Sequence, residues 1–300
     1  MCNSRLSNYV LVIVLGTLSV CYGSAASAIR AAKASPTLLA DSFEFTEGPV
    51  ADRAGNVYFT DQPNDRIMVW TIEGKLETFL QPSGRSNGLY FDHQGNLLAC
   101  ADERNQLWSI SPEKKVTVLV ENLDGKLLNG PNDLWVDPNG GIYFTDPFYK
   151  RNYWERNDKQ IEKENVYYMP PNRSGFGIAA GDFVRPNGIV GTPDGRKLYV
   201  ADLSGKETFV FEIGANGELS NRQPFVPMGS DGMTLDEEGN LYLTGKGVTV
   251  FNKSGSKIDE IPVNEGWTAN VCFGGIDRKT LFITAMDSLY AVEMNVKGAQ

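Results

Sequence analysis

The chain has 300 residues, of which 41% are hydrophobic, and its 31 glycines and 15 prolines favour short elements joined by many turns. This length and apolar content are sufficient for a sizeable buried core. The formal net charge of −9 argues against the basic surface with which proteins hold nucleic acids or anionic membranes, so we expect neither partner.

Residues 1–28 have the pattern of a secretory signal peptide. Arg5 lies in a short polar stretch, residues 9–20 are apolar, and the tripeptide ASA at 26–28 matches a cleavage site. The apolar run is too short to predict a membrane-spanning helix. We therefore expect an exported protein, periplasmic or secreted, with no membrane attachment after cleavage. The alternative is a lipoprotein anchored through Cys21, although the bulky Val20 precedes that cysteine where a small residue is expected.

Residues 29–36 are rich in alanine and serine, and we interpret them as a leader or linker. A single domain is expected from residue 37 to residue 300, because the pattern that follows continues without interruption almost to the end of the chain. Its first apolar stretch, Thr37–Ala40, is predicted to be a strand.

Six copies of one phrase follow, and each contains two apolar runs around a turn that carries Asp or Gly. Successive copies begin 40 to 55 residues apart, which is the length of a four-stranded propeller blade. The apolar runs are rich in β-branched and aromatic residues and are joined by hairpin signals such as D-x-x-G. The copies begin at Glu47, Asn87, Asn132, Asn187, Asp231 and Cys272.

This repeat predicts an all-β fold, a six-bladed β-propeller with four-stranded blades. Outer strands are expected between the phrases, for example at Arg66–Trp70 and Leu76–Leu80. The N-terminal strand Thr37–Ala40 is expected to close the last blade beside Ser288–Met294, because closure removes an exposed sheet edge. Four second strands end with an aspartate that we interpret as a cap for backbone N–H groups at the blade rim: Asp61, Asp102, Asp146 and Asp202.

The longest interval contains a polar and aromatic insertion from Phe148 to Glu164. It follows a second strand, so it lies at the same end of its blade as the residue that opens the phrase; we call this end the channel mouth. A loop of this length is either functional or disordered, and the sequence leaves both interpretations open. Aromatic residues in the insertion favour packing over the mouth. Asp146 directly precedes it and is the rim aspartate for which a role beyond capping is also considered.

In a propeller the first strand of each blade lines the central channel, so the residues that open the phrases converge on the axis. Two carboxylates would meet three amides there. Hard divalent cations prefer carboxylate and carbonyl oxygens, and a cation would offset the repulsion between two buried carboxylates. The alternative for each residue taken singly is an ordinary turn Asn or Asp before Gly. Five such residues in register favour a cation site.

The chain contains no cluster of Cys and His residues with metal-ligand spacing. Cys100 and Cys272 are the only cysteines after the predicted signal peptide, and they lie in different blades, so we expect two free, buried thiols. Cys272 opens the sixth phrase and is therefore placed on the axis. His93, the only histidine, lies in a turn at the far end of its hairpin, where we expect a solvated rather than a catalytic side chain.

The residue order E-G-P, P-N-D, P-N-G, S-D-G and V-C-F-G-G resembles the SMP-30/gluconolactonase/luciferin-regenerating enzyme family of six-bladed propellers. The resemblance extends from about Phe43 to the end of the chain, and it is strongest to the gluconolactonase branch, through FTDP after PND and NGL in the second copy. It implies a lactone hydrolase with a small-molecule lactone as substrate. It also implies one divalent cation, calcium in the first place, with zinc, magnesium or manganese as alternatives.

By the same resemblance, Glu47, Asn187 and Asp231 match metal ligands, and Asp231 also matches the proton acceptor. Asn132 matches a residue that contacts the substrate or, in related propellers, the metal. We expect Asn87 and Asn132 to bind substrate, since neutral amides both donate and accept hydrogen bonds. The cation would polarise the lactone carbonyl, and a water would attack it while Asp231 takes the proton.

One departure from the family pattern leaves alternatives open. Animal lactonases have an arginine two residues before the P-N-D asparagine, where this chain has Gly130, so their sugar contacts do not transfer. A related metal-dependent esterase or phosphotriesterase is one alternative function. A non-catalytic, calcium-stabilised propeller that binds a partner is another, because a fold does not dictate a function.

Overall fold

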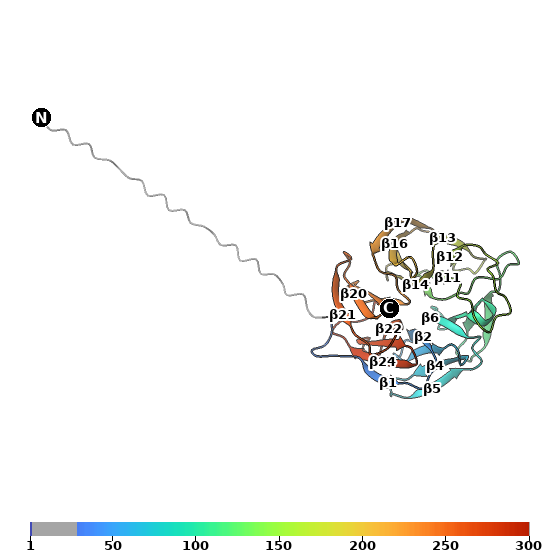
Figure 1. Cartoon of the computed structure of the whole chain (residues 1–300), viewed down its shortest axis with the longest axis horizontal. Coiled ribbons are helices and arrows are strands. Elements are labelled where there is room, and N and C mark those ends of the chain that lie inside the picture. The colour runs from blue at the N-terminus through green and yellow to red at the C-terminus, as the bar shows by residue number, and fades with distance from the viewer. Residues whose placement is uncertain (2–28, 300) are drawn as a thin grey trace.

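The structure is a computed structural model that describes Met1 and residues 29–299. Its strands form six four-stranded antiparallel sheets arranged in a ring, which is a six-bladed β-propeller (Figure 1). The predicted fold class is therefore confirmed. The predicted signal peptide lies, except for Met1, outside the described residues. Among the residues that are described, no helix is long and apolar enough to cross a membrane.

Each of the first five blades consists of four strands that are consecutive in the chain. The first blade contains β2 (Thr46–Ala51), β3 (Val57–Asp61), β4 (Arg66–Trp70) and β5 (Leu76–Leu80). The second contains β6 (Ser86–Phe91), β7 (Leu97–Ala101), β8 (Gln106–Ile110) and β9 (Val116–Val120), with the 3-10 turn η1 (Asp102–Arg104) after β7. The third contains β10 (Leu134–Val136), β11 (Ile142–Asp146), β12 (Glu164–Met169) and β13 (Gly177–Phe183).

The fourth blade contains β14 (Pro186–Gly191), β15 (Lys197–Asp202), β16 (Glu207–Ile213) and β17 (Leu219–Val226). The fifth contains β18 (Met233–Leu235), β19 (Leu241–Gly245), β20 (Gly247–Phe251) and β21 (Lys257–Ile261). The last blade combines both ends of the chain: β22 (Thr268–Gly274), β23 (Thr280–Ala285), β24 (Ser288–Glu293) and β1 (Thr37–Ala40).

Closure of the ring by the N-terminal strand is as predicted. β1 pairs antiparallel with β24, so that Thr37 lies opposite Ala291 and Leu38 lies opposite Tyr290. Figure 1 shows β1 at the outside of the ring, with β22 near its centre. The exposed edge of β24 is therefore covered by a segment from the other end of the chain.

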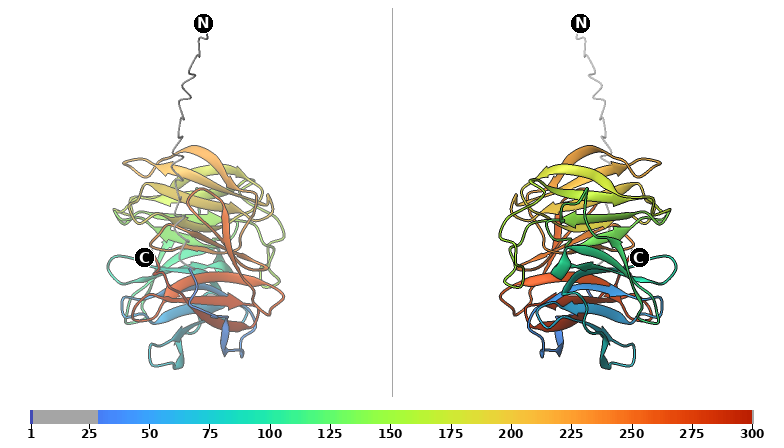
Figure 2. Two further views of the ribbon diagram at one scale, coloured as in Figure 1. Left: turned by 90° about the vertical axis from the view of Figure 1, so that its left-hand side faces the viewer. Right: turned by 90° about the vertical axis from the view of Figure 1, so that its right-hand side faces the viewer.

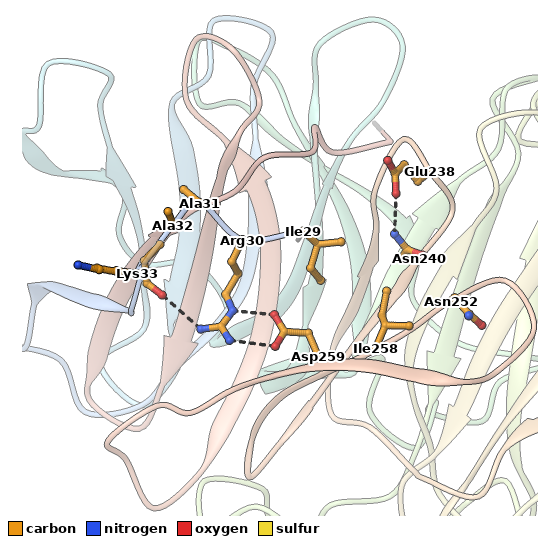
Figure 3. Close-up of a pocket in the computed structure, with 11 residues that line it drawn as sticks. Ile29, Arg30, Ala31, Ala32, Lys33, Glu238, Asn240, Asn252, Ile258 and Asp259 are labelled. Atoms are coloured by element: carbon orange, nitrogen blue, oxygen red, sulfur yellow. Dashed lines mark hydrogen bonds and ion pairs between the residues drawn. The ribbon is translucent and has the colours of Figure 1, made fainter. Parts of the chain in front are cut away.

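Contacts of the propeller begin before β1, in the segment that the sequence suggested to be a leader or linker. Ile29 is 7% exposed and belongs to the apolar cluster of the last two blades. Arg30 donates from Nε and Nη2 to the carboxylate of Asp259 at 2.6 and 2.9 Å (Figure 3). The backbone N–H of Asn295 donates to the carbonyl of Ile29 at 2.8 Å. This segment is thus attached to the domain by packing, an ion pair and backbone hydrogen bonds.

Inner strands are buried because the sheets pack face to face around the ring, as the two side views show (Figure 2). Every residue of β7, β11 and β19 is buried, whereas most residues of the outer strand β9 are exposed. Polar residues on the inner strands are therefore buried as well, and a buried polar group requires a hydrogen-bonding partner. This requirement makes the polar residues near the axis informative about function.

Candidate active site

The residues that open the phrases lie where the first strand of a blade leaves its regular pairing. In β2 the register shifts between Glu47 and Val50, and similar shifts occur in β6 and β14. Such a bulge bends the strand and re-aims its side chains. Gly48 follows Glu47 with a φ of 43°, and a Cβ there would lie 2.3 Å from the carbonyl oxygen of Asn87 in the next blade. The glycine thus allows neighbouring inner strands to meet closely.

The five predicted polar residues are all buried. Asn187 donates from Nδ2 to Asp231 Oδ1 at 2.7 Å, and the charge of Asp231 acts directly on Glu47. The structure therefore brings these three residues together. The side chains of Asn87 and Asn132 form no hydrogen bond to any residue between 29 and 299, so their amides are available to a ligand. The exposed fractions are 3% for Glu47, 4% for Asn87, 4% for Asn132, 1% for Asn187 and 8% for Asp231.

The sixth position was predicted wrongly. Thr268 pairs with Ala285 as Ser86 pairs with Ala101, so the residue equivalent to Asn87 is Ala269 and not Cys272. Cys272 lines a cavity together with His93, the residue expected at the end of its hairpin away from the mouth. In most copies a glycine follows the residue that opens the phrase. Asn270 replaces this glycine in the sixth copy, so the sequence pattern did not show which residue opens it. Among the described residues Cys100 and Cys272 are free and buried, as expected.

Two side chains fill the axis where other blades have glycine. They are Asp133 and Asn270, and Asn270 donates from Nδ2 to Asp133 Oδ2 at 3.4 Å. A Cβ on Gly88 would lie 2.7 Å from Asp133 Oδ1, and a Cβ on Gly232 would lie 2.0 Å from the Asn270 side chain. Burial raises the pKa of Asp133 to about 7. Sequence analysis missed this pair, although the alternation between N-D and N-G in the phrases was a usable signal.

Glu47 and Asp231 form a buried pair of acids. Burial raises the pKa of Glu47 well above its usual range, and repulsion from Asp231 raises it further. Burial also raises the pKa of Asp231 to about 6, against the opposing effect of hydrogen bonds from Trp267 and Asn187. Two carboxylates in such a place are unfavourable when both are ionised, and a cation between them would remove that cost.

The donor set suits a hard cation. In the part of the chain that the structure describes, no group of three or more His, Cys, Asp or Glu side chains is arranged so that it could hold a metal ion by itself. The buried set instead combines the two carboxylates with the amide of Asn187 and the nearby amides of Asn87 and Asn132. Carboxylate and amide oxygens with room for water are the ligands that calcium and similar ions prefer. The residues present therefore fit a divalent cation.

Trp267 is a site residue that sequence analysis missed. It lies in the loop before β22, and its Nε1 donates to Asp231 Oδ2 at 2.5 Å. Because Asn187 binds the other oxygen, both oxygens of Asp231 are held in place. Trp267 lies outside the repeated phrases, so nothing in their pattern pointed to it.

The insertion is packed rather than open. Arg151 Nε and the Tyr153 hydroxyl both donate to Asp102 Oδ2 at 2.6 Å, and Trp154 Nε1 donates to the Asp102 carbonyl at 2.9 Å. A Cβ on Gly130 would lie 3.1 Å from the Trp154 ring. The position of the arginine in animal lactonases is therefore covered by the insertion in this chain.

Asp146 was the rim aspartate for which a role beyond capping was considered, but in the structure that role belongs to another of the four. Asp146 accepts from the backbone N–H groups of Asn129 and Gly130 at 2.9 and 2.7 Å, so it is a cap, as are Asp61 and Asp202. Asp102 is the exception, since its carboxylate binds side chains of the insertion. It follows the end of β7, whereas Asp61 and Asp202 are the last residues of their strands.

Tyr149 carries the insertion into the site. Its hydroxyl accepts a hydrogen bond from Asn187 Nδ2 at 2.9 Å. The guanidinium carbons of Arg185 and Arg151 lie 4.8 and 5.5 Å from the centre of its ring. One aromatic side chain thus connects the amide beside Asp231 with two positive charges at the channel mouth.

Comparison with known proteins agrees with the motifs and with the fold. The sequence model of the SMP-30/Gluconolactonase/LRE-like region matches residues 45–287. The chain belongs to this family. Within the SMP-30/gluconolactonase family, it is 29% identical over 291 residues to a gluconolactonase of Zymomonas mobilis, which covers 87% of this chain and 82% of that protein.

Solved structures of this family superpose well on the propeller. A gluconolactonase from Xanthomonas campestris is 30% identical, covers 90% of this chain and 92% of its own, and has a TM-score of 0.83. A calcium-binding protein, regucalcin, from Agrobacterium tumefaciens shares the fold with a TM-score of 0.74 at 18% identity, over 87% of this chain and 94% of its own. The resemblance inferred from the sequence motifs is confirmed.

Proposed function

We propose that the protein is a divalent-cation-dependent lactone hydrolase of the gluconolactonase type. The observation that carries the proposal is the buried pair Glu47 and Asp231, joined to Asn187 at the centre of the ring. The gluconolactonases among its relatives support a lactone as the substrate.

Glu47, Asn187 and Asp231 would hold the cation, with Asn132 as a further ligand. A half-turn of the Asn187 amide would present its oxygen instead of Nδ2 to the ion. Calcium is the first candidate because all of these donors are oxygen atoms, and zinc, magnesium and manganese are alternatives. When bound, the cation would polarise the lactone carbonyl and stabilise the negative charge that develops on its oxygen.

Asp231 is the proposed proton acceptor. With a pKa of about 6 it is mostly ionised at neutral pH, so it can take a proton from the water that attacks the carbonyl carbon. It then returns this proton to the ring oxygen as the ring C–O bond breaks, and the product is a hydroxy acid. Trp267 holds the carboxylate in place, and Asn87 and Asn132 bind the substituents of the lactone ring.

The test is ring opening of a panel of aldonolactones by protein treated with a chelator and then given single cations. We expect activity only with cation, and a loss of about 10²–10⁴-fold in Asp231→Asn, the usual contribution of a general base. Asp194→Asn makes the same chemical change at an exposed turn and should be silent. Absence of ring opening with calcium, zinc, magnesium and manganese would defeat the proposal.

The same experiment separates the alternatives. Hydrolysis of aryl esters or phosphotriesters without hydrolysis of lactones would indicate a different hydrolase on the same cation site. A lower melting temperature after chelation, with no substrate turned over, would indicate a propeller that the cation only stabilises or a partner-binding propeller.

Export is part of the proposal. Cleavage after Ala28 would leave Ile29 as the first residue, and its packing and the ion pair of Arg30 would remain intact. N-terminal sequencing of protein from the periplasm and the medium should yield Ile29 first. A lipid on Cys21 would favour the lipoprotein alternative, and an intact N-terminus in the cytoplasm would contradict export.

A further inference from the structure

Arg185 is a positive charge without a partner beside the candidate active site. Its guanidinium takes part in no hydrogen bond or ion pair with any residue in the range 29–299, and its Nε is buried without a hydrogen-bond partner. It lies over the Tyr149 ring, with the guanidinium carbon 4.8 Å from the ring centre. Burying part of an unpaired cation is costly, so a residue held in this way requires an explanation.

The other arginines at the channel mouth have polar or charged partners in the protein, although the Nε of Arg85 and that of Arg156 are also buried without a hydrogen-bond partner. Arg151 forms an ion pair with Asp102 at 2.6 Å, and Arg85 lies 3.6 Å from Glu103. Arg156 donates from Nη2 to backbone carbonyls and lies over the Trp154 ring. In a chain with 37 acidic and 28 basic residues, acidic partners are plentiful, yet none of the described ones lies within ion-pair distance of Arg185.

Its place relative to the site follows from Tyr149. The ring of Tyr149 contacts Arg185, while its hydroxyl binds Asn187, the residue that also binds Asp231. Arg185 itself lies two residues before Asn187, where its backbone N–H is fixed by Asp202 at 2.8 Å. The unpaired guanidinium is therefore held one aromatic ring away from the proposed reaction centre, on a rigid part of the scaffold.

We propose that Arg185, together with Tyr149, forms an anion subsite and that the preferred substrates are lactones with an anionic substituent. A phosphate, sulfonate or carboxylate on the sugar lactone would provide the missing partner, since a guanidinium can bind such groups with two parallel hydrogen bonds. This inference rests on the proposed lactone hydrolase. It gives the substrate a charged end, fixed by Arg185, and a reactive end at Asp231.

Local pairing supports this assignment. A bound divalent cation would offset Glu47 and Asp231, and Asp102 already pairs with Arg151. A neutral lactone would leave the guanidinium of Arg185 without a partner, whereas an anionic substituent would provide one.

The test compares 6-phosphoglucono-1,5-lactone with neutral glucono-1,5-lactone as substrates of the cation-loaded wild type and of Arg185→Gln. We expect the variant to lose about 10–100-fold in kcat/KM on the phosphorylated lactone, the effect of losing one hydrogen bond between charged groups. The neutral lactone should change less than threefold. Arg185→Lys should retain part of the preference, and raising the salt concentration should reduce it.

Arg222→Gln is the matched control. Arg222 also lies over an aromatic ring in the same blade, 3.8 Å from the Phe209 centre, but on the outer strand β17. It should alter neither substrate. Equal losses on both lactones in Arg185→Gln, or no preference of the wild type for the phosphorylated lactone, would overturn the subsite while leaving the lactonase proposal intact.

Binding gives a readout that does not depend on turnover. Titration calorimetry with 6-phosphogluconate and with gluconate should show tighter binding of the phosphorylated compound to the wild type and no such difference in Arg185→Gln. If neither lactone is hydrolysed, the proposed function fails. Binding of 6-phosphogluconate that is insensitive to Arg185→Gln would refute the anion subsite on its own.

Discussion

Replacement of Trp267 by phenylalanine tests whether the residues around Asp231 tune its chemistry. The change keeps an aromatic ring but removes the Nε1–H that donates to Asp231 Oδ2 at 2.5 Å. A hydrogen bond to a charged group contributes about 1.5–3 kcal/mol. Because Trp267 is only partly buried, water can replace part of the lost bond, and we expect the lower end of this range. That corresponds to about a tenfold effect and to a pKa of Asp231 about one unit higher than its value of about 6.

The consequences can be measured in two ways. Titration calorimetry near pH 6.5 should show that Trp267→Phe binds the cation about threefold more weakly, since a rise of about one pKa unit leaves about a quarter of Asp231 ionised instead of about three quarters. The acid limb of kcat/KM for lactone hydrolysis should move to higher pH. Trp108→Phe is the control, because its Nε1 donates to Gln106 at 2.8 Å in another blade. Wild-type affinity in Trp267→Phe, or an equal loss in Trp108→Phe, would refute the reasoning.

Three further predictions concern pH and stability. Since the pKa of Asp231 is raised to about 6, the cation must displace a proton below that pH, so cation affinity should rise as the pH increases from 5 to 7.5; calorimetry that finds equal affinities would contradict this. Gly48→Ala should lower the free energy of unfolding by about 1–3 kcal/mol, because a Cβ there would lie 2.3 Å from the next blade. Gly95→Ala is the control, since a Cβ there has nothing within 4 Å, and urea unfolding should show a smaller loss for it. Ile29→Ala should lower the free energy of unfolding by about 2 kcal/mol or more, because Ile29 is only 7% exposed. Ile72→Ala, at a residue that is 42% exposed, should lower it little. Equal urea midpoints for the two variants would show that the N-terminal segment adds no stability.

Most of the fold could be predicted because one pattern is repeated in every blade. The outer strands Arg66–Trp70 and Leu76–Leu80 were predicted with the bounds that the structure has, since apolar runs and turn residues mark both ends. The five polar residues that open the phrases are buried at equivalent places, because a repeat transfers the geometry of one blade to the next. At these positions the repeated sequence pattern predicts the place that each residue takes in its blade.

Prediction was weaker wherever the repeat was broken. Cys272 was misplaced because the sixth phrase lacks the glycine that follows the opening residue in most other copies. The register is set by strand pairing, which the sequence similarity of this copy did not reveal. Trp267 and Tyr149 lie in loops, so their contacts with Asp231 and Asn187 depend on the path of the chain in space. Arg185 lies two residues before Asn187, which opens the fourth phrase, yet its lack of a partner could be recognised only once its neighbours in space were known.

The closing strand β1 has a consequence for how the protein is made. Among the strands of the propeller, β1 leaves the ribosome first and its partner β24 last, so the sixth sheet cannot form until β24 has been synthesised. Until then the growing polypeptide has an incomplete circle and two unprotected edges. Closure of the ring is therefore the last step of folding that this topology allows.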